Sequence, residues 1–271
     1  MKRKLYNFIK FLFARIFGTS ISISLRPIPN PNMKDPYKIT YVQSVDLEMY
    51  LDMRQALDQS YSLGVVDESA LNFLNKNIGS SNWFIDVGAN QGLYSCYILK
   101  NFPAINVLSI EPDPYNIEKL KRNLDLNKLK SSRVHIFEGG ASSCKEIREL
   151  MLNIAGNRAG SSIVIDQRKW TKQKENTILQ IPCQPLLDIM MQVGVAGKCA
   201  LKIDIEGAEF PVLEAFFENS PEHFYPFAIV AEAVGNTISL VGGSVVELLI
   251  RNGYSLVDHD DLNYFFLLKK L

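Results

Sequence analysis

The sequence predicts an α/β protein with a mainly parallel sheet that is covered by helices on both faces. Three short apolar runs, at 83–87, 107–111 and 134–138, alternate with segments of helical periodicity. This alternation of strands and helices is typical of a parallel sheet. A second observation is the turn Gly88–Gly92, which directly follows the first run. In such folds, a glycine turn between a buried strand and a helix start is a binding place for a nucleotide-like ligand.

The composition narrows the classes of protein to which the chain can belong. Its 271 residues are enough for one or two domains with a sizeable core. The 29 basic residues balance 29 acidic ones, and no long basic stripe runs through the core region, so we expect no nucleic-acid partner. The four cysteines lack a C-x-x-C pair and metal-ligand spacing, which predicts reduced core residues in a cytoplasmic protein. No run of eighteen apolar residues occurs, so no membrane-spanning helix is expected.

Residues 1–60 are predicted to form an amino-terminal extension. Within it, residues 1–17 place apolar side chains on one face of a helix and basic side chains on the other, and Lys10 argues against a signal peptide. Two interpretations stay open: this helix packs on its own domain or on a second copy of the chain, or it lies on an anionic membrane surface. Residues 18–36 contain four prolines, which predicts an irregular strap, and residues 37–49 suit a strand or hairpin.

The first part of the core region supplies strands and helices in regular alternation. Asp67–Ser69 have the residue types that begin a helix, and Gly79–Asn82 end it. A further helix is predicted from Leu93 to Leu99, directly after the glycine turn. Another begins at 113–116, where a proline suits the first turn. These helices connect the three predicted strands.

The glycine turn differs from the fingerprint of dinucleotide-binding proteins. Its spacing is D-x-G-x-x-x-G, and the carboxylate of Asp86 would repel a pyrophosphate. An acid at this position suits a ligand with positive charge near the turn, such as S-adenosylmethionine. Glu111 ends the second strand about 20 residues beyond the turn, where an acid reaches a pair of ribose hydroxyls. A tight strand–helix turn without a ligand is the alternative.

The second half of the chain first departs from the alternation and then returns to it. Residues 144–200 are predicted to be an insertion, with a hairpin of Met151–Ile154 and Ser162–Ile165, a strand at 177–183 and a helix at 186–193. This segment either covers a ligand at the carboxyl end of the sheet or decorates an edge. The remaining predicted elements are a strand at 200–205 followed by a turn at Gly207 and a helix, a strand at 227–232, a helix at 245–250, and a terminal hairpin of 254–258 with 263–268.

Five motifs carry a family resemblance. In order they read FIDVGANQG, IEPDP, EGGASS, LKIDIEGAE and VAEAV. Together they resemble the FkbM family of S-adenosylmethionine-dependent methyltransferases, from about Asn82 to the terminal hairpin. The resemblance implies a Rossmann-like class I methyltransferase domain over residues 61–271, with a seven-stranded, mostly parallel sheet whose last strand is antiparallel. It also implies S-adenosyl-L-methionine as the cofactor, and a hydroxyl of a sugar, glycan or polyketide-like natural product as the methyl acceptor.

The resemblance further implies roles for residues of the cofactor site. Asp86, Gly88, Asn90 and Gly92 would shape the methionine side, and Glu111 would bind the ribose hydroxyls. After the third strand, Gly140, Ala141 and Ser142 would border the adenine. Asp204 would lie beside the reactive methyl group and so belong to both the cofactor site and the catalytic site.

The same resemblance places Lys202, Glu206 and Glu232 near Asp204 as further catalytic candidates. Carboxylates that converge at the ends of parallel strands repel each other, so at least one should have a raised pKa and could accept a hydroxyl proton. We expect no metal, because no histidine or clear ligand spacing accompanies the acids; a shared divalent cation is the alternative. Other interpretations are that Asp204 and Glu206 cap the following helix, and that Lys202 and Glu209 are solvated.

Three functions remain in competition. The leading hypothesis is an O-methyltransferase for a small molecule or glycan. The basic helix at residues 1–17 suggests a second, a methyltransferase for a lipid-linked glycan at a membrane surface. A third is a non-catalytic partner subunit that binds S-adenosylmethionine.

Overall fold

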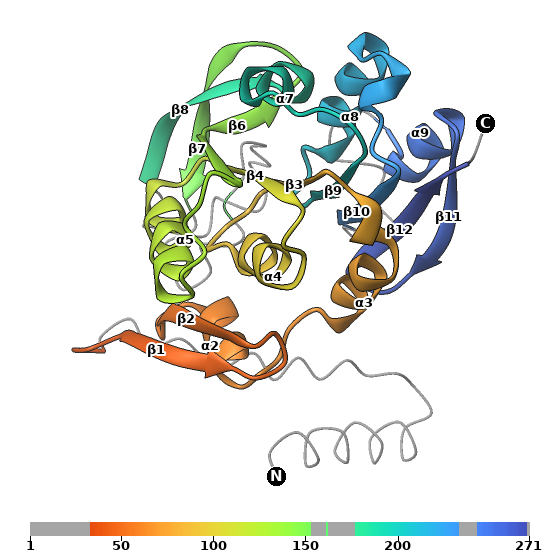
Figure 1. Cartoon of the computed structure of the whole chain (residues 1–271). Helices are drawn as coiled ribbons and strands as arrows, with labels where there is room; N and C mark the ends of the chain where they lie inside the picture. Colours follow the sequence, from red (N-terminus) through yellow and green to blue (C-terminus); the bar gives the residue numbers. More distant parts are fainter. Residues whose placement is uncertain (1–32, 153–160, 162–176, 233–242, 270–271) are drawn as a thin grey trace, which may run out of the picture.

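The computed structural model describes residues 33–152, 161, 177–232 and 243–269. Its centre is a seven-stranded sheet with the order β11-β12-β10-β9-β3-β4-β5, in which β12 runs antiparallel to both of its neighbours (Figure 1). The strands are β3 (Trp83–Val87), β4 (Asn106–Glu111), β5 (Val134–Glu138), β9 (Cys199–Ile203), β10 (Ala228–Glu232), β11 (Tyr254–His259) and β12 (Asn263–Leu268). This is the Rossmann-like class I methyltransferase arrangement, so the predicted fold class is confirmed.

Helices cover both faces of this sheet (Figure 1). One face carries α3 (Glu68–Asn77), α4 (Leu93–Asn101) and α5 (Pro114–Leu126), and the other carries α7 (Leu186–Val193), α8 (Glu209–Asn219) and α9 (Val245–Arg251). Alternate residues of β3 belong to separate cores: Phe84 packs with the first group, whereas Ile85 and Val87 pack with the second. Both faces are buried because the strands are parallel and lie between two helical layers.

The helix starts follow the signals predicted from the sequence. The Asp67 carboxylate accepts a hydrogen bond from Ala70 N at 3.0 Å and so caps α3, with the short η1 (Ile78–Ser80) following the helix. Asp113 caps α5 in the same way, through Tyr115 N at 3.0 Å, and Pro114 occupies the first turn. These caps satisfy backbone donors that would otherwise be unpaired, which fixes where each helix begins.

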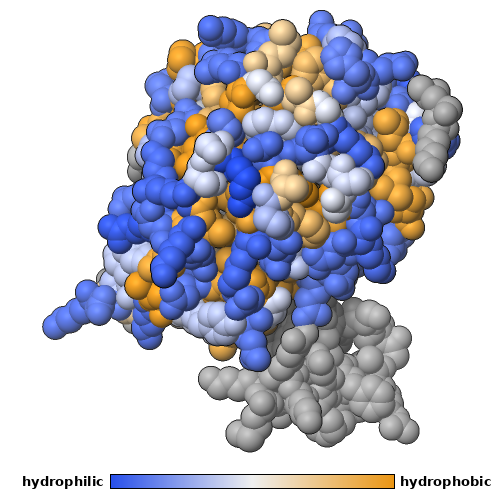
Figure 2. Space-filling view, in the orientation of Figure 1, coloured by the Kyte–Doolittle hydropathy of each residue, from blue (hydrophilic) through white to orange (hydrophobic). Residues whose placement is uncertain are grey.

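An amino-terminal hairpin lies against α5, beside the main sheet (Figure 1). It consists of β1 (Tyr37–Val42) and β2 (Leu47–Asp52), and α2 (Ala56–Ser62) follows. The predicted strand or hairpin at 37–49 is therefore a hairpin that extends to residue 52. The predicted amphipathic helix at 1–17 and most of the proline-rich strap lie outside the described residues. On the face shown in Figure 2, hydrophobic residues form separate patches among hydrophilic ones.

A second, smaller sheet has the order β6-β8-β7 and is formed by β6 (Gly140–Ser142), β7 (Glu146–Leu152) and β8 (Thr177–Pro185). Met151 pairs with Ile178, so the predicted pairing of residues 151–154 with 162–165 is wrong for Met151. The long strand β8 supplies the partner, and Leu150 with Ile181 belongs to a small core of its own. The segment 162–165 lies outside the described residues.

The cysteines largely match the expectation. Cys96, Cys183 and Cys199 are buried and free, whereas Cys144 is free but exposed, which corrects its assignment to the core. Within the described ranges, none of the helices combines the length and the apolar character that crossing a membrane requires.

Candidate cofactor-binding and active site

The site lies where the chain changes direction across the sheet. From β3 the chain continues outward through β4 and β5, and it later returns to place β9 on the other side of β3. A crevice forms outside the carboxyl ends of strands at such a point, and ligands bind there in open α/β sheets. Asp204 N donates to Val87 O at 3.0 Å, which ties the end of β9 to the end of β3.

The turn after β3 needs its glycines for two reasons. Gly88 has φ +80°, and a Cβ there would come within 1.9 Å of the carbonyl oxygen of Asp204. Gly92 has φ +81°, and a Cβ there would lie 2.1 Å from Cδ1 of Leu120. The glycines therefore allow both a left-handed backbone and a close approach to β9 and α5. Asn90, with φ 51°, also adopts the left-handed conformation.

Glu111 is buried at the carboxyl end of β4, with 5% of the residue exposed. Its Oε2 accepts a hydrogen bond from Asn90 N at 2.8 Å, and its Oε1 accepts one from Asp113 N at 2.9 Å. Burial raises the pKa of Glu111 to about 7, although the two backbone donors act in the opposite direction. Oε1 also accepts a hydrogen bond from Asn116 Nδ2 at 3.3 Å. The carboxyl group thus holds the glycine turn, and its Oε2 accepts a single hydrogen bond within the described residues.

Asp86 lies beneath the first turns of α4. Its Oδ2 accepts a hydrogen bond from Ser95 Oγ at 2.6 Å, and Ser95 Oγ lies 2.7 Å from Ser109 Oγ. Burial raises the pKa of Asp86, while Lys202 lowers it. Its Oδ1 is buried without a hydrogen-bond partner among the described residues. Such an acceptor is costly unless a donor or a cation reaches it.

Gly140, Ala141 and Ser142 form β6 and are buried. The residue before them, Gly139, donates its N–H to the carbonyl oxygen of Glu111 at 3.1 Å. The predicted adenine-side segment therefore lies next to the predicted ribose-binding acid.

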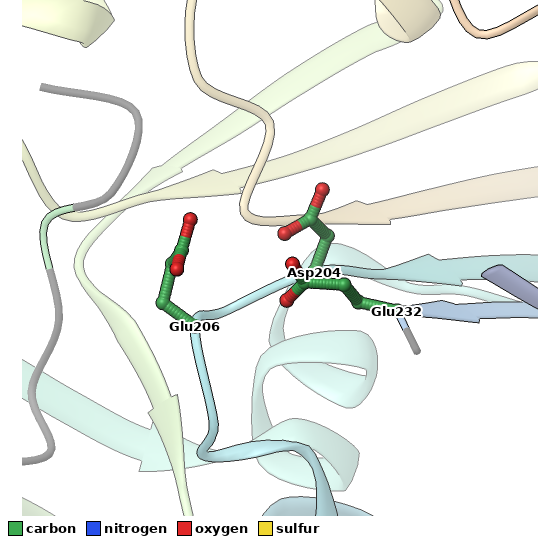
Figure 3. Close-up of side chains that lie close together, drawn as sticks. All are labelled: Asp204, Glu206 and Glu232. Carbon is green, nitrogen blue, oxygen red and sulfur yellow. The ribbon is translucent and has the colours of Figure 1, made fainter. Parts of the chain in front are cut away.

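Three carboxyl groups meet on the β9 side of the crevice (Figure 3). Asp204 follows β9, Glu206 lies in the next turn and Glu232 ends β10; each offers an oxygen, and these oxygens lie within 4.8 Å of one another. Burial and the negative charges of Asp204 and Glu206 raise the pKa of Glu232 to about 10. The expectation that converging acids include one with a raised pKa is confirmed. Oxygen donors so arranged can also hold a hard divalent cation.

Lys202 supplies a buried positive charge beside these acids. Only 3% of the residue is exposed, so its interpretation as a solvated residue is wrong. Its Nζ donates to Asp204 Oδ2 at 2.9 Å and lies 4.8 Å from the centre of the Tyr94 ring. Burial acts to lower the pKa of Lys202, but the negative charges of Asp204 and Asp86 outweigh it and raise this pKa. Lys202 therefore stays protonated at neutral pH.

Glu209 holds the turn between β9 and α8. It is buried, contrary to the solvated interpretation, and its Oε1 accepts hydrogen bonds from Ile205 N at 2.8 Å and Gly207 N at 3.3 Å. Ala208, the residue before α8, has no side chain to cap the helix. Glu209 therefore accepts the hydrogen bonds of these two N–H groups, and the Asp204 side chain forms an ion pair with Lys202.

Sequence reasoning missed Tyr94 and Gln91. Both are buried beside the candidate site, Tyr94 against Lys202 and Gln91 inside the glycine turn. Their only signal in the sequence was proximity to Gly92.

Among the histidines, His135 packs against Trp83 with ring centres 5.4 Å apart, whereas His223 and His259 are exposed.

The strand order, the glycine turn and the acid that ends β4 together define a class I methyltransferase domain. Residues 86–254 match the model of the methyltransferase FkbM domain, and this match covers most of the chain. The chain therefore belongs to the FkbM family, whose cofactor is S-adenosylmethionine.

Two curated fungal proteins are similar to this chain. Methyltransferase sdnD of Sordaria araneosa is 29% identical over 167 residues, which cover 52% of this chain and 63% of the relative. Methyltransferase 1 of Beauveria bassiana is 25% identical over 146 residues, covering 49% and 57%. The matched part thus spans less than two thirds of the length of each relative.

Among solved structures, the chain is similar to the precorrin-6y C5,15-methyltransferase of Geobacter metallireducens, with 13% identity, a TM-score of 0.43 and coverage of 74% of this chain and 87% of the other. It is also similar to TYW2 of M. jannaschii in complex with AdoMet, with 15% identity, a TM-score of 0.41 and coverage of 88% and 89%.

Proposed function

We propose that this protein is an S-adenosylmethionine-dependent O-methyltransferase that acts on a hydroxyl of a sugar, glycan or polyketide-like product. The observation that carries the proposal is the meeting of the glycine turn with Asp204: only a glycine at position 88 leaves room for the carbonyl oxygen of Asp204. A cofactor on this turn would therefore lie beside Asp204, whose carboxylate accepts from Lys202 Nζ at 2.9 Å.

The residues present fit the cofactor. Asp86 has a buried, unpartnered acceptor oxygen within the described residues, which suits the positively charged end of the ligand. Glu111 stands at the spacing expected for the ribose hydroxyls, and its Oε2 accepts a single hydrogen bond within the described residues. Gly140–Ser142 lie beside Glu111, in the position proposed for the adenine border.

The bound cofactor supplies a methyl group on a sulfonium, and the protein must align the acceptor and remove one proton. Alignment alone can be worth about 7–11 kcal/mol. We assign the proton to a carboxylate oxygen of Asp204, which Lys202 holds at 2.9 Å. Glu232, with its pKa raised to about 10, is a neutral carboxylic acid at pH 7 and therefore does not serve as the base.

The proposal needs no metal ion. The ammonium group of Lys202 already compensates the charge of Asp204 in the buried part of the cluster. A dication beside this ammonium would be repelled, since charges in a partly buried site interact strongly. The three acids nevertheless offer oxygens close enough together to hold a divalent cation, so a chelator distinguishes the two mechanisms.

The substitution Asp204→Asn tests the base. It should leave binding of S-adenosylhomocysteine intact and lower turnover by a factor of about 10²–10⁴, the usual contribution of a general base. Binding is measured by calorimetry, and turnover by transfer of a labelled methyl group to acceptors in a glycan and metabolite extract. Near-normal transfer by the variant would refute the assignment, and absence of transfer by the wild-type protein to every fraction would favour a non-catalytic binding subunit.

A further inference from the structure

Gln91 connects the glycine turn to the amino-terminal hairpin unit, which we define as residues 36–62. Its side chain is buried, and its Nε2 donates to Asp58 Oδ1 at 2.6 Å. Asp58 lies on α2, far from the turn in sequence. A residue in the middle of the candidate cofactor turn is thus held from outside the matched family domain, which begins at residue 86.

Asp58 is in turn fixed from two further sides. Its Oδ2 accepts a hydrogen bond from Asp52 N at 2.5 Å and forms an ion pair with Lys119 of α5. Asp58 and Lys119 are both nearly fully buried. A buried ion pair is weak support for stability, because an apolar replacement is often as stable, and its best-attested use is to fix one arrangement. Here the arrangement that it fixes includes Gln91.

Asn123 makes a second connection to the same turn. Its Nδ2 donates to the carbonyl oxygen of Gln91 at 2.8 Å, and its Oδ1 accepts from Tyr50 N of the hairpin at 2.7 Å. One helical turn later, Asn127 accepts from Glu48 N at 2.9 Å and donates to Glu48 O at 2.7 Å. Both asparagines thus bind the free edge of β2, but only Asn123 also forms a hydrogen bond to a residue of the turn; Asn127 Nδ2 donates instead to the backbone oxygen of Asn123 at 2.8 Å.

The turn contains one residue in a sparsely populated backbone conformation. Asn90, which is not a glycine, has φ 51°, and Gln91 directly follows it. A backbone held in a sparsely populated conformation persists when the surrounding structure over-determines it. Glu111 fixes the turn at Asn90 N from the side of the sheet, and the hairpin unit fixes it at Gln91 from the opposite side.

We propose that Gln91 is a positioning residue for the cofactor, and that Asp58 and Asn123 of the hairpin–α5 contact set the affinity for S-adenosylmethionine through it. This inference rests on the proposed assignment of the glycine turn to the cofactor. The amino-terminal hairpin is then part of the binding machinery, although it contributes no group that touches the ligand.

The test exchanges the amide of Gln91 and the carboxylate of Asp58 in the full-length protein. S-adenosylhomocysteine is the probe, and its Kd is measured by calorimetry. Gln91→Glu places a carboxylate against Asp58 and should raise Kd at least tenfold. Adding Asp58→Asn should return Kd to within about threefold of wild type. In the double variant the new amide donates to the new carboxylate, its oxygen still faces Asp52 N and Lys119, and the net buried charge is unchanged.

Asn127→Ala is the matched control, since the Asn127 side chain binds Glu48 of the hairpin and Asn123 of its own helix but forms no hydrogen bond to a residue of the turn. It should lower the melting temperature and leave Kd unchanged. If Gln91→Glu does not fold, Gln91→Met keeps the length of the side chain without the amide, and it should also raise Kd.

The inference is overturned if a folded Gln91 variant binds with the wild-type Kd, or if the double variant remains as weak as Gln91→Glu. It is also overturned if Asn127→Ala weakens binding in proportion to the stability that it loses, because the affinity then follows the stability of the whole protein and not a contact with the turn. Absence of binding by the wild-type protein has a different meaning: it removes the cofactor assignment, and the inference with it.

Discussion

The buried carboxyl group of Glu111 makes cofactor affinity depend on pH. Its pKa is raised from 4.5 to about 7, so that below neutral pH much of this acid is protonated. A protonated carboxyl group loses part of its capacity to accept hydrogen bonds from ribose hydroxyls. If the ionised form is the one that binds, affinity should fall by up to about tenfold for each pH unit below 7.

Glu111→Gln removes this titration. Its amide also places an N–H₂ group against Asn90 N or Asp113 N, where the wild-type oxygens accept. The loss of a charge-assisted hydrogen bond is worth about 1.5–3 kcal/mol, so Kd at pH 8 should rise about 10- to 150-fold. The variant's Kd should then stay nearly constant between pH 5.5 and 8.5.

Calorimetric titration of S-adenosylhomocysteine across this pH range checks both statements. The pH dependence of the free energy of unfolding is an independent check on the raised pKa. Because the folded-state pKa lies above the unfolded value, the contribution of Glu111 to stability is present below pH 4.5 and is lost as the pH rises through about 7. A flat affinity profile for the wild-type protein, or a wild-type Kd for a folded Glu111→Gln variant, would refute the reasoning.

Three further predictions concern the neighbouring turns and the acid cluster. Gly88→Ala should abolish cofactor binding, because its Cβ would meet the Asp204 carbonyl oxygen; Gly64→Ala, at φ +75° in open space, is the control for backbone strain alone and should retain binding in the same calorimetric assay. Glu209→Ala should lower the free energy of unfolding by about 2–3 kcal/mol in urea melts, because two buried N–H groups lose their acceptor, whereas Glu209→Gln should lose less; equal losses would contradict this. Chelator should leave methyl transfer intact, and activity restored by magnesium after its loss would turn the mechanism toward a metal.

Local signals explain why most elements were predictable. Asp67 and Asp113 mark helix starts because their carboxylates accept the first free N–H groups, and this needs only neighbouring residues. The helix Leu186–Val193 was predicted with its observed bounds, since apolar periodicity is also a local property. The acid at the end of each of several strands was likewise visible before the structure, because strand ends are marked by a change from apolar to charged residues.

Strand pairing and the burial of charged side chains were harder to predict from the sequence. The partner of Met151 is Ile178, and the choice among several apolar segments depends on contacts between residues that are distant in the sequence. Lys202 and Glu209 have charged side chains that usually remain solvated, and nothing next to them in the sequence indicates that α4 and the turn before α8 bury them. The role of Asp58 depends on Gln91 and Lys119, which belong to other elements.

The sequence by itself determined the class of fold, the glycine turn and the acids that end the strands, because these are properties of short segments and their order. Tertiary structure alone decided which of those acids stand together, which one carries a proton, and which lysine compensates them. Charges interact through space, over distances that only the folded sheet sets. Lys202 lies on β9 and Asp204 directly follows this strand, whereas Glu232 reaches Asp204 from the end of the neighbouring strand, β10. Burial then decides the pKa of each group, since removal from water penalises the charged form.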